Sequence, residues 1–439
     1  MAHVRRRSGA LLAFALSCAA PVALAAPSLP VAPAKLDAEV QTLLPGLETL
    51  YQEIHAHPEI AFHETRTAAV LAHQMRRLGF TVTEGVGGTG LVALYENGRG
   101  PTVLVRTELD ALPMTEATGL PYASQDPTAA HSCGHDLHMA IWVGTAATLL
   151  QFKSAWHGRL MFIAQPAEET VAGAKAMMAD NLYSRFGKPD FALALHVSNS
   201  PAGQLMLKPG TLTTALDNLR ITFKGRGAHG SMPNASIDPV VMAAHFVTDV
   251  QSVVSREKNP AEFGVITVGS FQAGTAPNII PDQAVVELTM RSYSPQIRSL
   301  LLEGAKRTAL ATAAMANAPQ PEILVTAGAS SVENDPVVTA RIGALFQGLF
   351  GSNLDLEPVY GQPLFASEDY PEFINGDAPV PSLFFELGAY DPKVIAADKA
   401  SGTPVPTNHS PLFAPAMEPT IQVGVRAMSY AVMNLLHGR

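Results

Sequence analysis

Short apolar runs that alternate with segments of helical spacing restrict the fold of this chain more than any other feature. Helical apolar spacing occurs at residues 36–55, 64–78 and 140–152. Apolar runs with the length of buried strands lie between and after them, at residues 102–105, 160–164 and 191–195. Because strands that alternate with helices form parallel sheets covered on both faces, we predict an α/β domain with a mostly parallel sheet flanked by helices.

The pattern changes near residue 216 and changes back near residue 332. Between these points a strand, a helix, two strands and a helix follow one another, at residues 219–223, 239–255, 264–271, 284–291 and 295–316. This order predicts a small α+β domain inserted into the first. A strand at 381–386 and a long helix at 414–436 then resume the first pattern. We therefore predict two domains: a catalytic domain of residues 35–215 and 329–439, and an inserted domain of residues 216–328.

The first residues have the features of a signal peptide. Residues 5–7 are arginines, residues 10–20 form an apolar run, and residues 23–25 offer a small-residue cleavage site. We therefore predict a signal peptide of residues 1–25 and an exported protein, either periplasmic or secreted. The apolar run is short for a bilayer span, so stable membrane insertion is disfavoured. A twin-arginine route and lipid attachment at Cys18 are the alternatives that this segment leaves open.

Charge and cysteine content narrow the classes of function. The chain has 29 Lys and Arg against 38 Asp and Glu, a net charge of −9, which disfavours nucleic acid as a partner. Removal of residues 1–25 would leave Cys133 as the single cysteine, which excludes an internal disulfide. Cys133 is then a buried small hydrophobe, a metal ligand or a nucleophile, and its neighbours decide among these roles.

The richest cluster of chemically active side chains surrounds this cysteine, in His131-Ser132-Cys133-Gly134-His135-Asp136-Leu137-His138. Thiolate and imidazole are good ligands for zinc and similar ions. Cys133 and His135 flank a glycine, so an irregular backbone can turn both side chains toward one ion. Asp136 and His138 suit a bridging or an outer position. A merely polar surface loop is the alternative, and the density of ligands disfavours it.

Two adjacent carboxylates, Glu168 and Glu169, follow the predicted strand 160–164. Sites in open α/β sheets form at the carboxyl ends of strands. One carboxylate can bind a metal while the other takes a proton from an activated water molecule. The alternative is an acidic helix N-terminus, which the helix dipole favours on its own.

Three further residues lie where predicted strands or helices begin or end. His196 follows the strand 191–195, which makes it a third ligand candidate, although a lone histidine is more often structural. Asp110 follows the strand 102–105 and can orient a metal-bound histidine. His409 precedes the last helix, where the alternative is a plain N-cap loop with Ser410 as the cap.

Three residues of the inserted domain can recognise an anion. His229 lies in a glycine-rich loop, Asn278 in a second loop, and Arg291 at the end of a strand. These side chains are suitable donors for a substrate carboxylate or a developing oxyanion. Their spacing does not show that they converge, and an ordinary surface loop is the alternative for each.

Four motifs together resemble one known family. They are Cys-Gly-His-Asp-x-His (133–138), Gln-Pro-Ala-Glu-Glu (165–169), Gly-x-Gly-x-His (225–229) and Ala-Pro-Asn-x-Ile-Pro (276–281). The combination resembles the aminoacylase and glutamate carboxypeptidase-like metallopeptidases. Within these it is similar to the amidohydrolase branch that contains hippurate hydrolases and plant auxin-conjugate hydrolases. The resemblance extends from residues 55–59 to the final helix.

The resemblance implies a metal-binding α/β domain and an inserted lid domain through which two chains form a homodimer. It implies two divalent ions per subunit, zinc, manganese or cobalt, held by Cys133, His135, Glu169, His196 and His409. Glu168 would be the general base and acid, with Asp110 as its helper behind the metals. His229 would stabilise the oxyanion, within the chain or across the dimer interface. Asn278 and Arg291 would receive the substrate carboxylate.

The chain departs from the usual pattern of this branch in two places. Glu108 stands where the branch usually has Asp, and its extra methylene either pushes a side chain toward the metals or is absorbed. The loop 361–370 is also less typical, so the resemblance leaves the choice of substrate open.

These features together predict a metal-dependent amidohydrolase that cleaves N-acyl amino acids. The nearest alternative is a dipeptidase or carboxypeptidase that acts on small peptides. A non-catalytic exported metal-binding protein is disfavoured, because metal storage does not need a free Glu168 beside Glu169. Catalysis by a Cys133 nucleophile with His135 is a third alternative, and such a thiol enzyme would survive a chelator.

Overall fold

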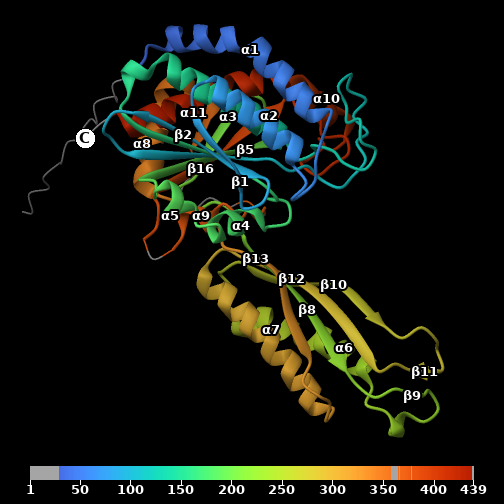
Figure 1. Cartoon of the computed structure of the whole chain (residues 1–439). Helices are drawn as coiled ribbons and strands as arrows, with labels where there is room; N and C mark the ends of the chain where they lie inside the picture. The colour runs from blue at the N-terminus through green and yellow to red at the C-terminus, as the bar shows by residue number, and fades with distance from the viewer. Residues whose placement is uncertain (1–28, 357–363, 365, 377, 438–439) are drawn as a thin grey trace, which may run out of the picture.

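The computed structural model describes residues 29–356, 364, 366–376 and 378–437. The chain forms a large domain around an eight-stranded sheet and a small domain around a four-stranded sheet, joined end to end (Figure 1). The predicted signal peptide, residues 1–25, lies outside the described residues, as do positions 361–363 and 365 of the loop 361–370.

The large sheet has a parallel centre. Its strands lie in the order β1 (Thr81–Val86), β2 (Gly90–Asn97), β4 (Gly158–Gln165), β3 (Thr102–Glu108), β5 (Phe191–Pro201), β16 (Ser382–Tyr390), β6 (Leu205–Leu207) and β15 (Leu354–Leu356). The four central strands β4, β3, β5 and β16 run parallel to one another. This confirms the predicted α/β fold with a mostly parallel sheet, since the runs at 102–105, 160–164 and 191–195 form three of these strands.

Helices cover both faces of this sheet (Figure 1). One apolar core lies under α1 (Pro33–His55), α2 (Thr65–Arg77), α3 (His135–Gln151), α8 (Pro336–Phe350) and α11 (Met417–Leu436). The core on the opposite face lies against α4 (Gly173–Ala179), α5 (Leu182–Phe186) and α9 (Pro371–Ile374). Helix α10 (Pro392–Ser401) has no buried residue and lies at the surface.

Helix α3 is the central helix of the first face, and its position fixes the segment that precedes it. It packs against both α1 and α11. A side chain at Gly144 of α3 would lie 2.6 Å from Val425, and one at Gly424 of α11 would lie 2.5 Å from Ile141. These glycines therefore let α3 and α11 approach closely, which holds the N-terminus of α3 in a defined place.

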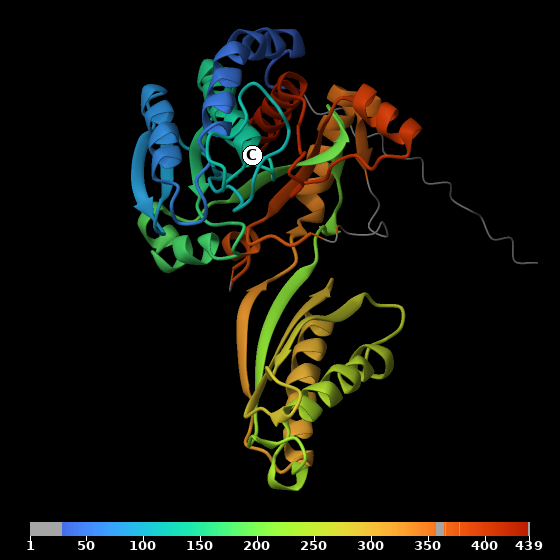
Figure 2. The same cartoon turned by 90° about the vertical axis from the view of Figure 1, so that its right-hand side faces the viewer.

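The small domain is an antiparallel sheet with helices on one face. Its strands lie in the order β10 (Gly264–Ala273), β12 (Gln283–Ser292), β8 (Ala215–Lys224) and β13 (Glu322–Ala329). Helices α6 (Pro239–Asp249) and α7 (Pro295–Met315) pack on this sheet and form a third apolar core. A short ribbon of β9 (Ala228–His229) and β11 (Ile279–Ile280) lies at the end that is farthest from the large domain (Figure 2).

Several elements differ from the sequence prediction or are absent from it, and three of them show the physical reasons. The helix predicted at 239–255 ends at Asp249 and continues as a π-helical turn, Val253–Glu257. The sequence pattern does not predict strand β13, because as an edge strand it buries only one of its eight side chains. The same reason applies to β1 at the edge of the large sheet.

The two chain crossings between the domains lie side by side. Strand β7 (Gly210–Thr211), on the way into the small domain, pairs with β14 (Glu333–Asn334), on the way back. The Leu212 backbone N–H also donates to the Val332 carbonyl at 2.8 Å. The junction is therefore a short two-stranded connection.

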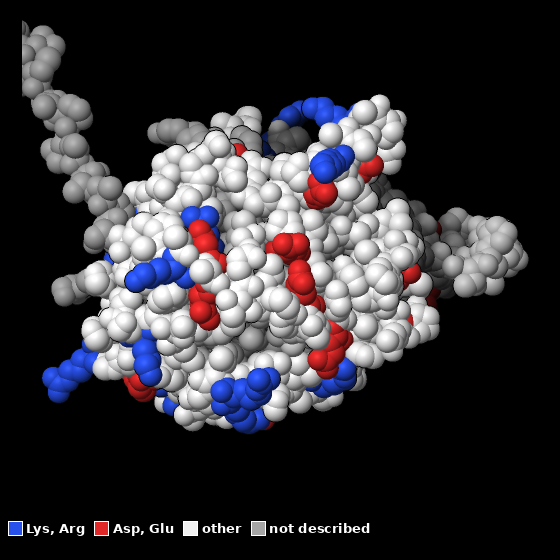
Figure 3. Space-filling view, turned by 90° about the horizontal axis from the view of Figure 1, so that it is seen from above, with Lys and Arg blue, Asp and Glu red and all other residues white. Residues whose placement is uncertain are grey.

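The surface of the large domain carries charges of both signs. On the face that is seen from above, Lys, Arg, Asp and Glu are scattered among a majority of uncharged residues (Figure 3). Within the described part of the chain, none of the helices is both long and apolar enough to span a bilayer.

Candidate active site

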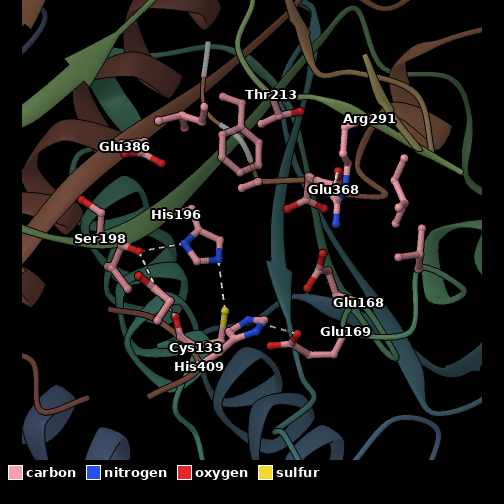
Figure 4. Close-up of a pocket in the computed structure, with 18 residues that line it drawn as sticks. Cys133, Glu168, Glu169, His196, Ser198, Thr213, Arg291, Glu368, Glu386 and His409 are labelled. Carbon is pink, nitrogen blue, oxygen red and sulfur yellow. Dashed lines mark hydrogen bonds and ion pairs between the residues drawn. The ribbon is translucent and has the colours of Figure 1, made fainter. Parts of the chain in front are cut away.

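A pocket of about 350 Å³ opens at the carboxyl ends of the central strands, beside the junction with the small domain. Its walls include Cys133, Glu168, Glu169, His196 and His409, which come from separate segments of the chain (Figure 4). Parallel strands place their carboxyl ends at one edge of the sheet, which explains why these distant segments meet here.

Cys133 and His135 lie on either side of a turn that only glycine accommodates. Gly134 has φ of 93°, and a side chain there would lie 2.3 Å from Val197 Cγ2. His135 is the first residue of α3, and Cys133 lies in the turn before it. The predicted irregular backbone between the two side chains is therefore present.

The His135 ring is oriented by a backbone hydrogen bond. Its Nδ1 lies 2.7 Å from the Asp110 carbonyl oxygen, so Nδ1 carries the proton and donates. The lone pair of Nε2 is then free, and Nε2 is buried without a hydrogen-bond partner among the described residues. It lies 3.7 Å from Glu168 Oε2 and 4.0 Å from Glu169 Oε1. This is the arrangement of a metal-ligating histidine.

His196 has the same arrangement. Its Nδ1 lies 2.8 Å from the Val197 carbonyl oxygen, and Nε2 faces Cys133 Sγ at 3.5 Å. The strand does not end before His196, as the sequence suggested, but continues to Pro201. It continues because β16 pairs with it beyond this point.

Glu168 and Glu169 lie in a tight turn between β4 and α4, and not at a helix N-terminus. Ala167, just before them, has φ of 51°. Two carboxylates hold this turn: Glu64 accepts from the Ala167 N–H at 2.8 Å, and Asp110 Oδ2 accepts from the Glu169 N–H at 2.9 Å. The turn is therefore anchored by hydrogen bonds on both sides of Glu168.

His409 lies in a loop that is bound to the cysteine segment. Its N–H donates to the Ser132 carbonyl at 2.8 Å, and its Nε2 lies 3.3 Å from Glu169 Oε2. The neighbouring Asn408 side chain donates to the carbonyls of Cys133 and Val197, at 2.7 and 3.0 Å. Ser410 is not a helix cap, since α11 begins only at Met417.

The donor set fits divalent cations. Ligand atoms within 4.8 Å of one another occur in Cys133, His135 and His196, and also in Cys133, Glu169 and His409. One oxygen of Glu169 and one of Asp110 are buried without a hydrogen-bond partner among the described residues, like His135 Nε2. Thiolate, imidazole and carboxylate together suit zinc, and carboxylate with imidazole also suits manganese or cobalt.

Excess negative charge around Glu168 supports this fit. Burial raises the pKa of Glu168 well above its usual value, and the nearby Glu368, Glu169 and Asp369 raise it further. Burial also raises the pKa of the Cys133 thiol, with Glu169 the next contributor. A cation placed among these groups would relieve the repulsion between them.

The extra methylene of Glu108 is absorbed into a buried network and does not reach the pocket. His138 Nε2 accepts from the Val197 N–H at 2.9 Å, so Nδ1 carries the proton and donates to Glu108 Oε2 at 2.9 Å. The other Glu108 oxygen accepts from Arg106. Both nitrogens of His138 are therefore occupied, which leaves no lone pair for a metal.

Arg106 joins this network to the wall of the pocket. It is buried and donates to Glu368 at 2.6 Å and to Gln165 at 2.9 Å. Gln165 in turn donates to Asp369 at 2.6 Å. Arg106 therefore neutralises carboxylates that would otherwise lie unpaired near Glu168.

Comparison with known proteins agrees with this geometry. Residues 104–429 match the model of Peptidase family M20/M25/M40. The chain belongs to this family. It is therefore a metal-binding hydrolase that acts on amide bonds, and the resemblance noted from its motifs is confirmed.

Three relatives illustrate the similarity. Hippurate hydrolase of Campylobacter jejuni is 33% identical over 340 residues, 76% of this chain and 86% of the relative. N-acetyldiaminopimelate deacetylase of Streptococcus pneumoniae is 33% identical over 385 residues, 86% of this chain and 96% of the relative. The solved structure of the Bacillus subtilis YXEP protein, a dinuclear metal-binding peptidase, has a TM-score of 0.70 and 26% identity, and the match covers 90% of this chain and 99% of that one.

The three residues that the sequence singled out in the inserted domain do not lie together in the structure. Arg291 lines the pocket, where its guanidinium donates to Ser367. His229 and Asn278 lie together at the β9–β11 ribbon, exposed and away from the pocket of their own chain. Figures 1 and 2 both show this ribbon at the far end of the small domain.

Four functional neighbours were missed by sequence reasoning. Arg106, Glu368 and Asp369 form the buried network, and Glu386 of β16 lines the pocket. A charged residue inside an apolar strand is the available signal for Arg106 and Glu386, because burial of such a side chain needs a partner or a function. Glu368 and Asp369 lie in the loop 361–370, which the sequence marks as less typical of the branch, but they carry no such local signal.

Proposed function

We propose that this M20 enzyme hydrolyses the amide bond of N-acyl amino acids, with two divalent ions held by Cys133, His135, Glu169, His196 and His409. One observation carries the proposal: these ligand atoms cluster at one pocket that also contains Glu168 and Arg291. The names of two relatives, hippurate hydrolase and N-acetyldiaminopimelate deacetylase, support an N-acyl amino acid as the substrate class.

Glu168 is the proton carrier in this proposal. Divalent ions, when bound, make a water molecule more acidic and polarise an amide carbonyl. Glu168 lies close enough to His135 and Glu169 to share a ligand group with them, but it is not one of the five proposed ligands, so in this proposal its carboxylate accepts a proton from the attacking water. The same carboxyl group then donates the proton to the leaving nitrogen.

Asp110 positions the machinery without touching the substrate. It is completely buried, and its side chain accepts from the Glu169 N–H while its carbonyl accepts from His135. It thus fixes one proposed ligand and the turn that carries Glu168. Arg291 is the receptor for the substrate carboxylate, since it lines the pocket and is partly buried.

His229 and Asn278 act across a dimer interface in this proposal. The Ser231 N–H donates to His229 Nδ1 at 3.1 Å, so in the neutral ring Nε2 carries the proton and can donate to an oxyanion. Because the β9–β11 ribbon lies away from its own pocket, these donors would serve the pocket of a second copy. A homodimer formed through the small domain would bring them there.

Export of the mature chain completes the proposal. Cleavage after residue 25 would give a periplasmic or secreted enzyme that begins at Ala26. Mass spectrometry of the chain recovered outside the cytoplasm should find this N-terminus. Recovery of only the uncleaved chain would contradict it.

The direct test is hydrolysis of a panel of N-acyl amino acids and dipeptides by metal-loaded and chelator-treated protein. We expect cleavage of N-acyl amino acids that is lost with the chelator and returns with zinc, manganese or cobalt. Activity that survives chelation would favour the Cys133 nucleophile instead. Cleavage of dipeptides alone would favour a dipeptidase, and no cleavage with metals bound would favour a metal-binding protein.

A further inference from the structure

Glu386 is a carboxylate in the pocket that the proposed mechanism does not use. It lies on β16, directly beside His196 of β5 in the parallel register. Side chains alternate along a strand, and Phe384, two residues earlier, also lines the pocket. Glu386 and His196 therefore point to the same side of the sheet, and both line this pocket.

The Glu386 carboxylate has no hydrogen bond or ion pair with any described residue. It also belongs to none of the groups whose ligand atoms lie within 4.8 Å of one another, so it is not part of the proposed metal centre. Glu386 is partly exposed, and the surface that it lines is that of the pocket, so a charged group of a bound ligand is a partner that this carboxylate can receive there.

Glu386 and Arg291 place opposite charges on opposite walls of the pocket. Figure 4 shows the two side chains on opposite sides of the pocket, with Cys133, Glu169 and His409 grouped away from both. Arg291 has no ion pair among the described residues, and its hydrogen-bond partner there is the neutral Ser367 hydroxyl. The pocket therefore offers an uncompensated cation on one wall and an uncompensated anion on the opposite wall.

We propose that Glu386 is a subsite for a protonated amine on the acyl part of the substrate. The inference rests on the proposed function, in which Arg291 binds the carboxylate of the amino acid part and the amide lies over the ligand cluster. The acyl part then extends toward the opposite wall, where Glu386 lies. The substrate class is an N-acyl amino acid whose acyl group carries an ammonium group, a class that includes dipeptides and their homologues with a longer amino-acyl chain, so that both ends of the substrate are charged.

The test compares matched substrates that differ only in this charge. Glycines N-acylated with glycyl, β-alanyl and 4-aminobutyryl groups are each paired with the methyl isostere: propionyl, butyryl and pentanoyl. Acyl groups of three chain lengths are used, because the chain must span the distance from the amide to the Glu386 carboxylate. The ratio of kcat/KM, amine over methyl, is measured at about pH 7.5, where amines of this kind are largely protonated.

We expect a ratio of about 10 or more for at least one length, and a loss of most of this preference in Glu386→Gln, because a charge-assisted hydrogen bond is removed. The matched control is Glu303→Gln, the same change at a side chain of α7 that is 63% exposed. It should leave the ratio unchanged. A ratio near one in the native protein, or a preference that persists in Glu386→Gln, overturns the proposal.

A binding measurement separates this proposal from the proposed function. Calorimetry with the same ligands on metal-loaded Glu168→Gln protein needs no turnover. The amine ligand should bind about tenfold or more tightly than its methyl isostere, and the added Glu386→Gln change should abolish the difference. Equal affinities, or no binding of either ligand, overturn the subsite. Absence of turnover with this preference intact contradicts the hydrolytic function alone.

Discussion

Glu108 shows how the role of a single side chain can be decided by its partners. Its two oxygens contact His138 and Arg106, so the longer side chain spans a gap inside the network. The network lies directly behind the pocket, because His138 also accepts from the Val197 N–H next to His196. The position therefore contributes to stability and to the support of a proposed ligand.

We predict that Glu108→Gln destabilises the protein by about 1–3 kcal/mol, because Arg106 or His138 loses its carboxylate partner in a buried site. Urea unfolding measures the change. Glu96→Gln is the matched control, since the Glu96 side chain is 67% exposed and its pair with Arg159 lies at the surface. The control should change stability by about 0.5 kcal/mol or less. Equal effects of the two variants would contradict the network.

The ligand candidates could be found from the sequence because their signals are local. Cys133, His135, Glu168 and Glu169 lie in two short motifs, and the structure brings both motifs to one pocket. Glu386 could not be assigned in this way. Its neighbour His196 lies on another strand, and their proximity depends on the register of β5 and β16, which is not encoded locally.

At the scale of elements, the turn before α3 is the feature on which the pocket depends most. Gly134 combines positive φ with a close approach to Val197, so it sets how Cys133 and His135 face each other. The helix behind this turn is held by its close contacts with α1 and α11. The turn is therefore a rigid part of the scaffold.

We predict that Gly134→Ala lowers metal affinity by at least about tenfold, since the new side chain would overlap Val197 and displace the two flanking residues. Metal titration measures the loss. Gly119→Ala is the matched control, because Gly119 has φ of 70° but open space around its Cα. The control should cost about 1–2 kcal/mol of stability from backbone strain and leave metal affinity intact. Equal metal affinity in both variants would refute the role of this turn.

The contact between α1 and the start of α3 makes the stability of the protein depend on pH. His55, the last residue of α1, lies 2.6 Å from Asp136 and 3.3 Å from Glu116. Burial lowers the pKa of His55, but the hydrogen bonds with Asp136 and Glu116 outweigh it and raise the pKa to about 9. The rings of Tyr51 and Tyr122 also face His55. A further electrostatic neighbour is His131, whose pKa is lowered by burial to about 4.

A histidine whose pKa is raised on folding stabilises the protein fully below its unfolded pKa of about 6.5. This contribution is lost as the pH rises through about 9. We therefore predict that His55→Gln narrows the difference in stability between pH 6.5 and pH 9.5, measured by urea unfolding of both proteins. A pKa difference of one between the folded and unfolded chain corresponds to about 1.4 kcal/mol, so the shift from about 6.5 to about 9 predicts an effect of about 3 kcal/mol. An identical pH profile in the variant would contradict the assignment.

At the scale of the whole molecule, the separation of the β9–β11 ribbon from the pocket is the main consequence of the architecture. Sequence patterns predict both types of domain, because strand and helix periodicity are local. The relative placement of the two domains depends on the short junction at β7 and β14. Sequence could therefore not show that Arg291 would reach the pocket while His229 and Asn278 would not.

Mixing two inactive variants tests whether His229 serves a partner's pocket. Glu168→Gln and His229→Ala proteins are unfolded and refolded together, so that mixed dimers form. If His229 acts across the interface, each mixed dimer contains one intact site, and about a quarter of native activity should return by random pairing. Refolding each variant alone is the control. No recovery, with dimers shown by light scattering, would mean that His229 does not act in trans.

The proposed mechanism depends most directly on the separate roles of Glu168 and the neighbouring ligands. The decisive measurement is metal content and turnover of Glu168→Gln beside the native protein, with the best N-acyl amino acid of the panel. We predict two bound ions in both proteins and a loss of turnover of about 10²- to 10⁴-fold in the variant. Turnover that survives the change, or metal that is lost with it, would contradict the mechanism, because Glu168 would then be dispensable or a ligand.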